Sequence, residues 1–109
     1  MAIKSNIIID QGSDYSVTVD LTDANGNTMI LSGYSGRAAM RKSFTSTTSK
    51  DFTVSINASA GEVTLSMDSD YTANIAAGRY LYDVEVVSSA NVVTRVLQGI
   101  ATISPEITR

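Results

Sequence analysis

The sequence contains no cysteine and no histidine among its 109 residues. Without cysteine there can be no disulfide framework and no thiolate metal site, and neither an oxidising nor a reducing compartment is indicated. Without histidine the chain lacks the commonest general base, the commonest metal ligand and the usual pH switch near neutrality. We therefore expect a protein that is not an enzyme, with no catalytic residues, no metal and no cofactor.

Charge and long apolar runs are also scarce. Eight Lys and Arg stand against eleven Asp and Glu, for a net charge of −3 at pH 7, and the basic residues are scattered apart from the pair Arg41 and Lys42. No basic stripe is available for a phosphate backbone, so we expect no nucleic-acid binding. The apolar run at residues 7–9 is too short for a signal-peptide core or a membrane span. We expect no membrane association, and synthesis in the cytoplasm without targeting.

What the chain does contain is typical of β-structure. Valine, isoleucine, threonine, serine and tyrosine dominate, and the one proline, Pro105, lies near the end. Turn signals at intervals of about 8 to 12 residues separate segments with alternating apolar and polar side chains. The segments expected to form strands are 3–10, 15–22, 28–31, 34–42, 52–56, 62–67, 79–87 and 92–103. They predict one domain over residues 1–109, an all-β, Ig-like Greek-key sandwich of about seven or eight antiparallel strands.

Some details of this sandwich are also expected. Residues 3–22 should open it as a hairpin, and the small inward residues of 34–42 suggest a close approach of the two sheets. Residues 43–51 are too rich in serine and threonine to pack and should form the longest and most mobile loop. Residues 68–76 lose the alternation and could form one helical turn between the sheets.

The most regular stretch is 77–87, where a glycine turn leads into a strand with two distinct faces. One face should lie on the core and the other should point outward; the core residues are Tyr80, Tyr82, Val84 and Val86, and the outward residues are Leu81, Asp83, Glu85 and Val87. Tyr80 stands at the start of a late strand after Ala-Gly-x, which is the pattern of the immunoglobulin tyrosine corner. The chain departs from antibody domains because it has neither paired cysteines nor tryptophan.

The last two strands are expected to pair so that Glu85 faces Arg95, with Val84 opposite Val96 and Val86 opposite Thr94. A register shifted by one would place Arg95 among the inward side chains, where an unpaired charge costs several kcal/mol. A cross-strand ion pair between Glu85 and Arg95 is the plain structural interpretation. It is favoured over a catalytic role for Asp83 and Glu85, because two carboxylates on one solvated strand face do not flank a substrate and have no apolar pocket.

The same register predicts an apolar outward surface that a monomer rarely leaves in water. Its members are Leu81, Val87, Val93 and Leu97, with Glu85 and Arg95 among them. We expect these six residues to form an interface with another subunit. The alternative is that loops of the same chain cover this surface.

Two acidic clusters invite a metal-site interpretation that the spacing disfavours. Asp23, Asn25 and Asn27 resemble the opening of a calcium loop, but position 34 holds Tyr34 where a bidentate Glu is needed. We expect a tight turn there instead. Asp68 and Asp70 are expected to cap the helical turn that follows them.

Several motifs together resemble those of bacteriophage virion proteins. These are the Gln-Gly turn within 10–15, the 23–27 turn, Gly-Glu-Val-Thr-Leu at 61–65, Gly-x-Tyr-x-Tyr-Asp-Val-Glu at 78–85, Leu-x-Gly at 97–99 and the closing Thr108-Arg109. The pattern is similar to that of small tail and baseplate proteins of tailed phages, including the N-terminal domain of upper baseplate proteins. The long terminal extension typical of larger baseplate members is missing, which argues against a receptor-carrying role.

The resemblance implies a structural module that docks by its sheets or edges and carries no catalytic residues. We expect a non-enzymatic virion protein, an adaptor or surface component of tail, baseplate, neck or capsid. Its partners would be other virion proteins and further copies of itself. The alternative is a host-directed adhesion or carbohydrate-binding module, for which the candidate aromatic side chains are Tyr34, Phe44 and Tyr71. A small hydrolase would need an acid or base that the sequence does not offer.

Overall fold

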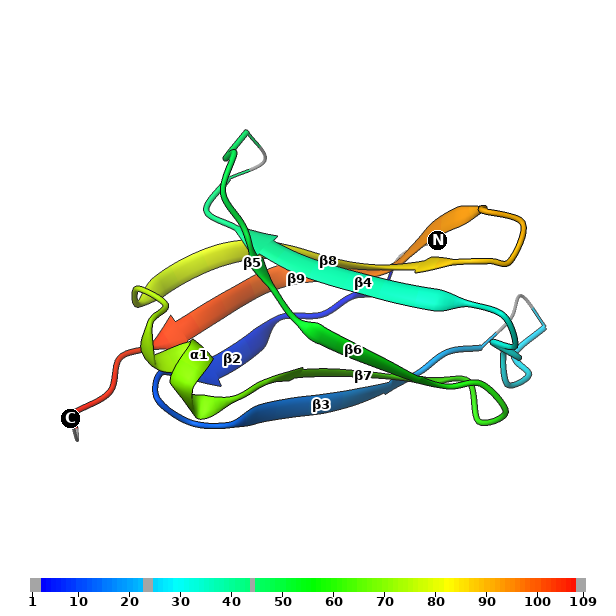
Figure 1. Cartoon of the computed structure of the whole chain (residues 1–109), viewed down its shortest axis with the longest axis horizontal. Helices are drawn as coiled ribbons and strands as arrows, with labels where there is room; N and C mark the ends of the chain where they lie inside the picture. The colour runs from blue at the N-terminus through cyan, green and yellow to red at the C-terminus, as the bar shows by residue number, and fades with distance from the viewer. Residues whose placement is uncertain (1–2, 23–24, 44, 108–109) are drawn as a thin grey trace.

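Two β-sheets and one short helix make up the protein in the computed structural model, which describes residues 3–22, 25–43 and 45–107 (Figure 1). Sheet A is formed by β1 (Ile3–Lys4), β2 (Ile7–Asp10), β9 (Val93–Ser104), β8 (Gly78–Val87), β4 (Ser35–Arg41) and β5 (Lys50–Asp51). Sheet B has the order β3 (Tyr15–Asp20), β7 (Glu62–Met67) and β6 (Thr53–Asn57). The helix α1 (Ser69–Ala73) connects β7 to β8. The prediction of a mainly-β, sandwich-like architecture is confirmed.

The expectation that all strands are antiparallel is wrong, and the described residues form nine strands rather than seven or eight. β1 and β2 both run parallel to β9. The hairpin expected over residues 3–22 is also wrong, because β2 belongs to sheet A and β3 pairs with β7 in sheet B. Crossing from one sheet to the other lets both strands bury an apolar face: Ile9 is fully buried from sheet A, while Val17 and Val19 pack against the core from sheet B.

The inward alternation predicted for the central strands is confirmed. The buried members of these strands are Ala38 and Met40 on β4, Val63, Leu65 and Met67 on β7, and Tyr80, Tyr82, Val84 and Val86 on β8. They form one continuous core with residues from the other strands. Each side chain of this kind contributes roughly 1.5–3 kcal/mol when it is removed from water. Burial of these alternate side chains in the shared core therefore holds the two sheets together.

The chain passes from sheet A to sheet B at Phe52, between β5 and β6. The N–H of Phe52 donates to the carbonyl oxygen of Ala38 at 3.0 Å, and its ring meets Tyr82 edge-on at 6.2 Å. Close by, Gly36 lies under β6, where a Cβ atom would stand 2.7 Å from Cγ1 of Val54. A larger residue at Gly36 has no room because the two sheets approach closely at this point, as the small side chains of β4 predicted.

The helical turn expected within 68–76 is present as α1, but its N-terminus is capped differently. Asp68 occupies the N-cap position without a side-chain hydrogen bond, and the carboxylate of Asp14 accepts the N–H of Ser69 at 2.7 Å instead. Thr72 is fully buried and its hydroxyl accepts the N–H of Gly12 at 3.1 Å. Both contacts tie α1 to the turn between β2 and β3.

Two other expected segments differ in extent. The short strand predicted at 28–31 is reduced to a single bridge between Thr22 and Thr28. The turn predicted at 23–27 lies partly outside the described residues. β9 is the longest strand and ends at Ser104, immediately before Pro105, as expected because proline cannot donate to a sheet.

Candidate protein interface

The hairpin of β8 and β9 carries the six residues predicted to form an interface. Near its tip the register is the expected one: Glu85 lies opposite Arg95, and Val87 lies opposite Val93. The register then shifts between Val84 and Glu85, so that Val84 pairs with Leu97 rather than with Val96. Val96 is thus the extra residue of a β-bulge, in which two residues of one strand oppose one residue of its partner.

The bulge overturns the outward position expected for Leu97. Leu97 is 4% exposed and belongs to the core, and the adjacent Val96 is 9% exposed. Two neighbouring strand residues can both point inward only where a bulge breaks the alternation. The signal was present in the sequence: Thr94 and Val96 continue one phase of the alternation, whereas Leu97, Ala101 and Ile103 follow the other.

The outward face of sheet A consists of five cross-strand rows, because paired residues share a face of the sheet. From the α1 end toward the hairpin tip the first four are Ile8, Thr102 and Arg79; then Ile100, Leu81 and Arg41; then Gln98, Asp83, Ala39 and Asp51; then Arg95, Glu85 and Arg37. In the fifth row, Val93, Val87 and Ser35 close the face at the tip. The face therefore carries charged residues in four of its five rows, with its apolar residues gathered at the α1 end and at the hairpin tip, rather than being apolar throughout.

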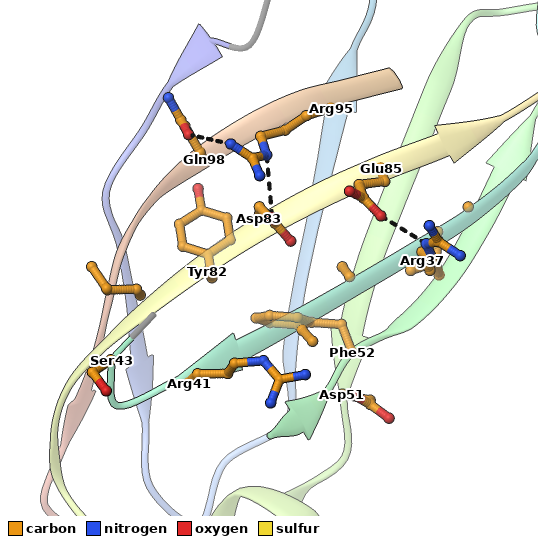
Figure 2. A pocket seen from close by; sticks show the side chains of 15 residues that line it. Arg37, Arg41, Ser43, Asp51, Phe52, Tyr82, Asp83, Glu85, Arg95 and Gln98 are labelled. Atoms are coloured by element: carbon orange, nitrogen blue, oxygen red, sulfur yellow. Dashed lines mark hydrogen bonds and ion pairs between the residues drawn. The ribbon is translucent and has the colours of Figure 1, made fainter. Parts of the chain in front are cut away.

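The charged middle is held by two ion pairs, shown in Figure 2. Arg37 Nε lies 2.7 Å from Glu85 Oε1, and Arg95 Nε lies 3.2 Å from Asp83 Oδ2. The ion pair expected between Glu85 and Arg95 is wrong, although these residues do lie opposite each other. Glu85 binds across β4 instead, and Arg95 reaches diagonally to Asp83 and to the amide oxygen of Gln98 at 3.3 Å.

A hollow of about 650 Å³ lies over this charged region. It is lined by outward residues of β4, β8 and β9, by the inward Gly36, Ala38 and Tyr82, and by Phe52 and Val54 at the sheet-switching connection. Arg41 borders it and donates from Nη1 to the carbonyl oxygen of Ser46 at 3.0 Å. Three guanidinium groups and three carboxylates thus surround one concave surface (Figure 2).

Two exposed isoleucines on the same face were missed by the sequence analysis. Ile8 is 68% exposed and Ile100 is 36% exposed, whereas Val93 of the predicted interface is 47% exposed. Ile8 could have been found from the alternation of β2, in which Ile9 points inward. Ile100 could have been found only by recognising the phase change at the bulge, because its face depends on that change.

The groups whose pKa deviates from the ordinary value are three buried or half-buried tyrosines, Tyr15, Tyr80 and Tyr82. Burial raises the pKa of Tyr80, whose hydroxyl donates to the carbonyl oxygen of Ala76 at 2.8 Å. Burial also raises the pKa of Tyr82, although its hydrogen bond to the carbonyl oxygen of Ser5 acts in the opposite direction. Both hydroxyls therefore stay protonated as donors and hold backbone segments in place.

Among the described motifs of the sequence resemblance, those at 61–65, 78–85 and 97–99 lie on or next to β7, β8 and β9, and the one at 10–15 includes the turn between β2 and β3. The amide of Gln11 donates to the carbonyl oxygen of Ile75 at 2.9 Å, and its oxygen accepts the N–H of Glu106 at 3.0 Å. Gly99 leaves room for the carbonyl oxygen of Ser5, which a Cβ atom at this position would overlap. Gln11 thus joins the segment after α1 to the segment after β9, and Gly99 lets β9 approach the chain between β1 and β2.

The aromatic residues considered for carbohydrate binding do not share one surface in the described part of the chain. Tyr34 is half-buried against the core, and the hydroxyl of Tyr71 accepts the N–H of Asp51 at 3.0 Å. Phe44 lies outside the described residues. No specific observation therefore favours a glycan platform.

Over residues 3–22, 25–43 and 45–107, no group of three or more His, Cys, Asp or Glu side chains could hold a metal ion. The same residues include no helix of the length and apolar character needed to span a membrane. Comparison with protein-family models and with curated protein sequences finds no match to this chain.

Proposed function

We propose that this chain is a non-enzymatic structural protein of a bacteriophage particle, an adaptor or surface component of tail, baseplate, neck or capsid. It acts through protein–protein contacts made by the outer face of sheet A. The observation that carries this proposal is the composition of that face. Apolar Leu81, Val87 and Val93 stand near the two ends of a concave region in which Arg37 and Arg95 are paired with Glu85 and Asp83.

Such a face suits recognition between proteins. Interfaces combine apolar contacts with arginine and satisfied hydrogen bonds, and charge complementarity sets the orientation of the partners. Arg37 and Arg95 are held by Glu85 and Asp83 before any partner arrives. Their side chains lose less freedom on binding than unpaired ones, which favours affinity.

The resemblance to small tail and baseplate proteins supports the placement in a phage particle. Its motifs coincide with contacts that hold distant parts of the chain together, as at Gln11 and Gly99. A particle protein must keep its shape under repeated contacts. The partners in this proposal are other virion proteins and further copies of the chain.

We also propose that the sandwich is Ig-like. The order β3-β7-β6 matches strands B, E and D of an immunoglobulin domain, and β9-β8-β4-β5 matches strands G, F, C and C′. The hydroxyl of Tyr80, near the start of β8, donates to the carbonyl oxygen of Ala76 four residues upstream. A tyrosine corner is defined by a bond of this kind. β1 and β2 differ from the first strand of a constant-type domain, since they pair with β9 and not beside β3.

The proposed function is tested in the phage whose genome carries the gene. Purified particles should contain the chain by mass spectrometry, and immunogold labelling should place it at one site on each particle. A nonsense mutation in the gene should give particles that lack this component and are defective in assembly or infection.

A Leu81→Asp variant supplied in trans should fold but fail to join the particle, because a charge would stand in the apolar end of the face. Ala60→Asp, in the exposed turn between β6 and β7, adds the same charge outside the strands of both sheets and should join normally. Complete, infectious particles without the chain would reject the proposed function.

A further inference from the structure

The two sheets differ in their charges, because sheet A carries both signs and sheet B carries only negative charge among the described residues. All described basic residues lie on sheet A or directly after β4: Lys4, Arg37, Arg41, Lys42, Lys50, Arg79 and Arg95. Sheet B and its adjoining segments, residues 11–22, 25–33 and 52–77, contain no Lys or Arg. Their described charges are the acids Asp14, Asp20, Glu62, Asp68 and Asp70. The protein thus has one sheet that holds all its described cations, together with four acids, and one sheet whose described charges are all anions.

Unpaired charges stand at the α1 end of both faces. Arg79 is exposed on the outer face of sheet A, opposite Thr102, and forms no ion pair with any described residue. On the other side of the sandwich, Asp68 is exposed at the N-cap of α1 and its side chain makes no capping hydrogen bond. Asp14 is exposed nearby, with Oδ1 bound to the N–H of Ser69. Both carboxylates lie without a basic partner on their own sheet.

A hollow of about 310 Å³ lies between these two acids. Its lining combines Asp14 and Asp68 with the hydroxyls of Ser16, Thr53 and Ser66. Two carboxylates and several hydroxyl oxygens are acceptors, and a guanidinium group offers five N–H donors in a planar fork. The hollow therefore has the chemistry to receive an arginine side chain.

The surroundings of Arg79 supply apolar contact area. Ile8 and Ile100 are exposed beside it on the outer face, and Leu81 completes the adjoining row. An arginine at the edge of an apolar patch is typical of interface anchors, since arginine is enriched there and aliphatic neighbours exclude water around it.

From this complementarity we propose that copies of the chain stack face to back, with Arg79 of one copy seated in the acidic hollow of the next. The outer face of sheet A thus contacts the outer face of sheet B. The occupant of the hollow is a second copy of this chain. This inference rests on the docking role proposed above for sheet A and adds the partner and the geometry.

The spacing of charges along the strands fits this arrangement. On sheet A, Arg79 lies six residues along β8 from Glu85, whose row also contains Arg37 and Arg95. On sheet B, Asp14 lies six residues before Asp20 of β3. At about 3.3–3.4 Å per residue both separations are roughly 20 Å. With Arg79 in the hollow, the row of Arg37, Glu85 and Arg95 reaches Asp20 and Glu62, which lie opposite each other on β3 and β7.

The geometry lets one copy make both contacts at once. Arg79 begins β8 and the hollow lies where β3 begins and β7 ends, so both sites are at the α1 end but on opposite sheets (Figure 1). Such a heterologous contact repeats from copy to copy and builds a ring if the rotation closes, or a filament if it does not. A dimer made by two sheet A faces would stop at two copies.

The test is the mass of the full chain by size-exclusion chromatography with light scattering. Wild type should form species larger than a dimer at about 0.1 M salt and lose them at about 1 M, where charges are screened beyond about 3 Å. Arg79→Glu and Asp68→Lys should each give monomers with unchanged circular dichroism, while Asp70→Lys, outside the hollow, should assemble as wild type does. Asp68→Asn provides a milder second variant and should also weaken assembly.

Mixing the two monomeric variants decides the geometry. Asp68→Lys retains Arg79 and Arg79→Glu retains the hollow, so together they should associate although neither does alone. Wild-type-like assembly of Asp68→Lys, or a monomeric wild type at millimolar concentration, would overturn the proposal. If the chain does not stack but is found in phage particles, the proposed function is retained. If the chain stacks but is absent from particles, the proposed function is rejected and the stacking is not.

Discussion

Glu85 and Arg95 lie directly opposite each other on β8 and β9, yet their carboxylate and guanidinium groups bind different partners. Glu85 turns to Arg37 on β4, and Arg95 turns to Asp83. The two ion pairs therefore link all three central strands of sheet A. A direct pair between Glu85 and Arg95 would have linked only two.

A double-mutant cycle should detect this choice of partner. Glu85→Gln and Arg37→Gln should show a coupling free energy of roughly 0.2–1 kcal/mol in urea unfolding, as for exposed or cross-strand ion pairs. The same cycle with Arg95→Gln in place of Arg37→Gln is the control and should give coupling near zero. Stronger coupling to Arg95 than to Arg37 would contradict the observed pairing.

Removing the hydroxyl of Tyr80 should destabilise the sandwich. Tyr80→Phe leaves the carbonyl oxygen of Ala76 without its donor, so we expect a loss of about 1 kcal/mol in the free energy of unfolding. Tyr34→Phe is the matched control, because the Tyr34 hydroxyl has no hydrogen-bond partner among the described residues. Equal stabilities of the two variants would count against a structural role for this bond.

Adding a methyl group at Gly36 should be unfavourable. The new Cβ in Gly36→Ala would stand 2.7 Å from Val54, and forced overpacking typically costs about 1–3 kcal/mol. Shortening the neighbour in Gly36→Ala with Val54→Ala should recover part of that loss relative to the sum of the single changes. Strict additivity of the two substitutions in thermal unfolding would show that the two sheets do not meet there.

Stability should fall in alkaline solution. Burial raises the pKa of Tyr15, Tyr80 and Tyr82 above the 10.0 of an exposed tyrosine, so the folded protein binds these protons more tightly than the unfolded chain. Their contribution is complete below pH 10 and is lost as the pH rises through the folded-state pKa values. Urea unfolding at successive pH values above 9 measures this loss.

The Tyr15→Phe variant tests how much of this loss belongs to Tyr15. Its stability should decline less steeply above pH 10 than that of wild type, because one raised pKa is gone. Parallel curves for the two proteins would show that Tyr15 takes no part.

Much of the fold could be predicted from local pattern. The two-residue alternation correctly identified the buried faces of β4, β7 and β8, and the loss of alternation at 68–76 marked α1. The bulge at Val96 could not be placed by extending one register, because a single extra residue reverses the face of everything beyond it. This is why Leu97 was assigned to the interface and Ile100 was missed.

The sequence by itself determined the β-structure, the composition of the core and the absence of cysteine and histidine, since these depend on residue identity and on local alternation. Only the tertiary structure decided which strands are neighbours. It placed β2 beside β9, gave Glu85 the partner Arg37, and gathered the cations on one sheet and only anions on the other. The physical reason is that these relationships join residues far apart in the chain, and sheet pairing and close packing set them.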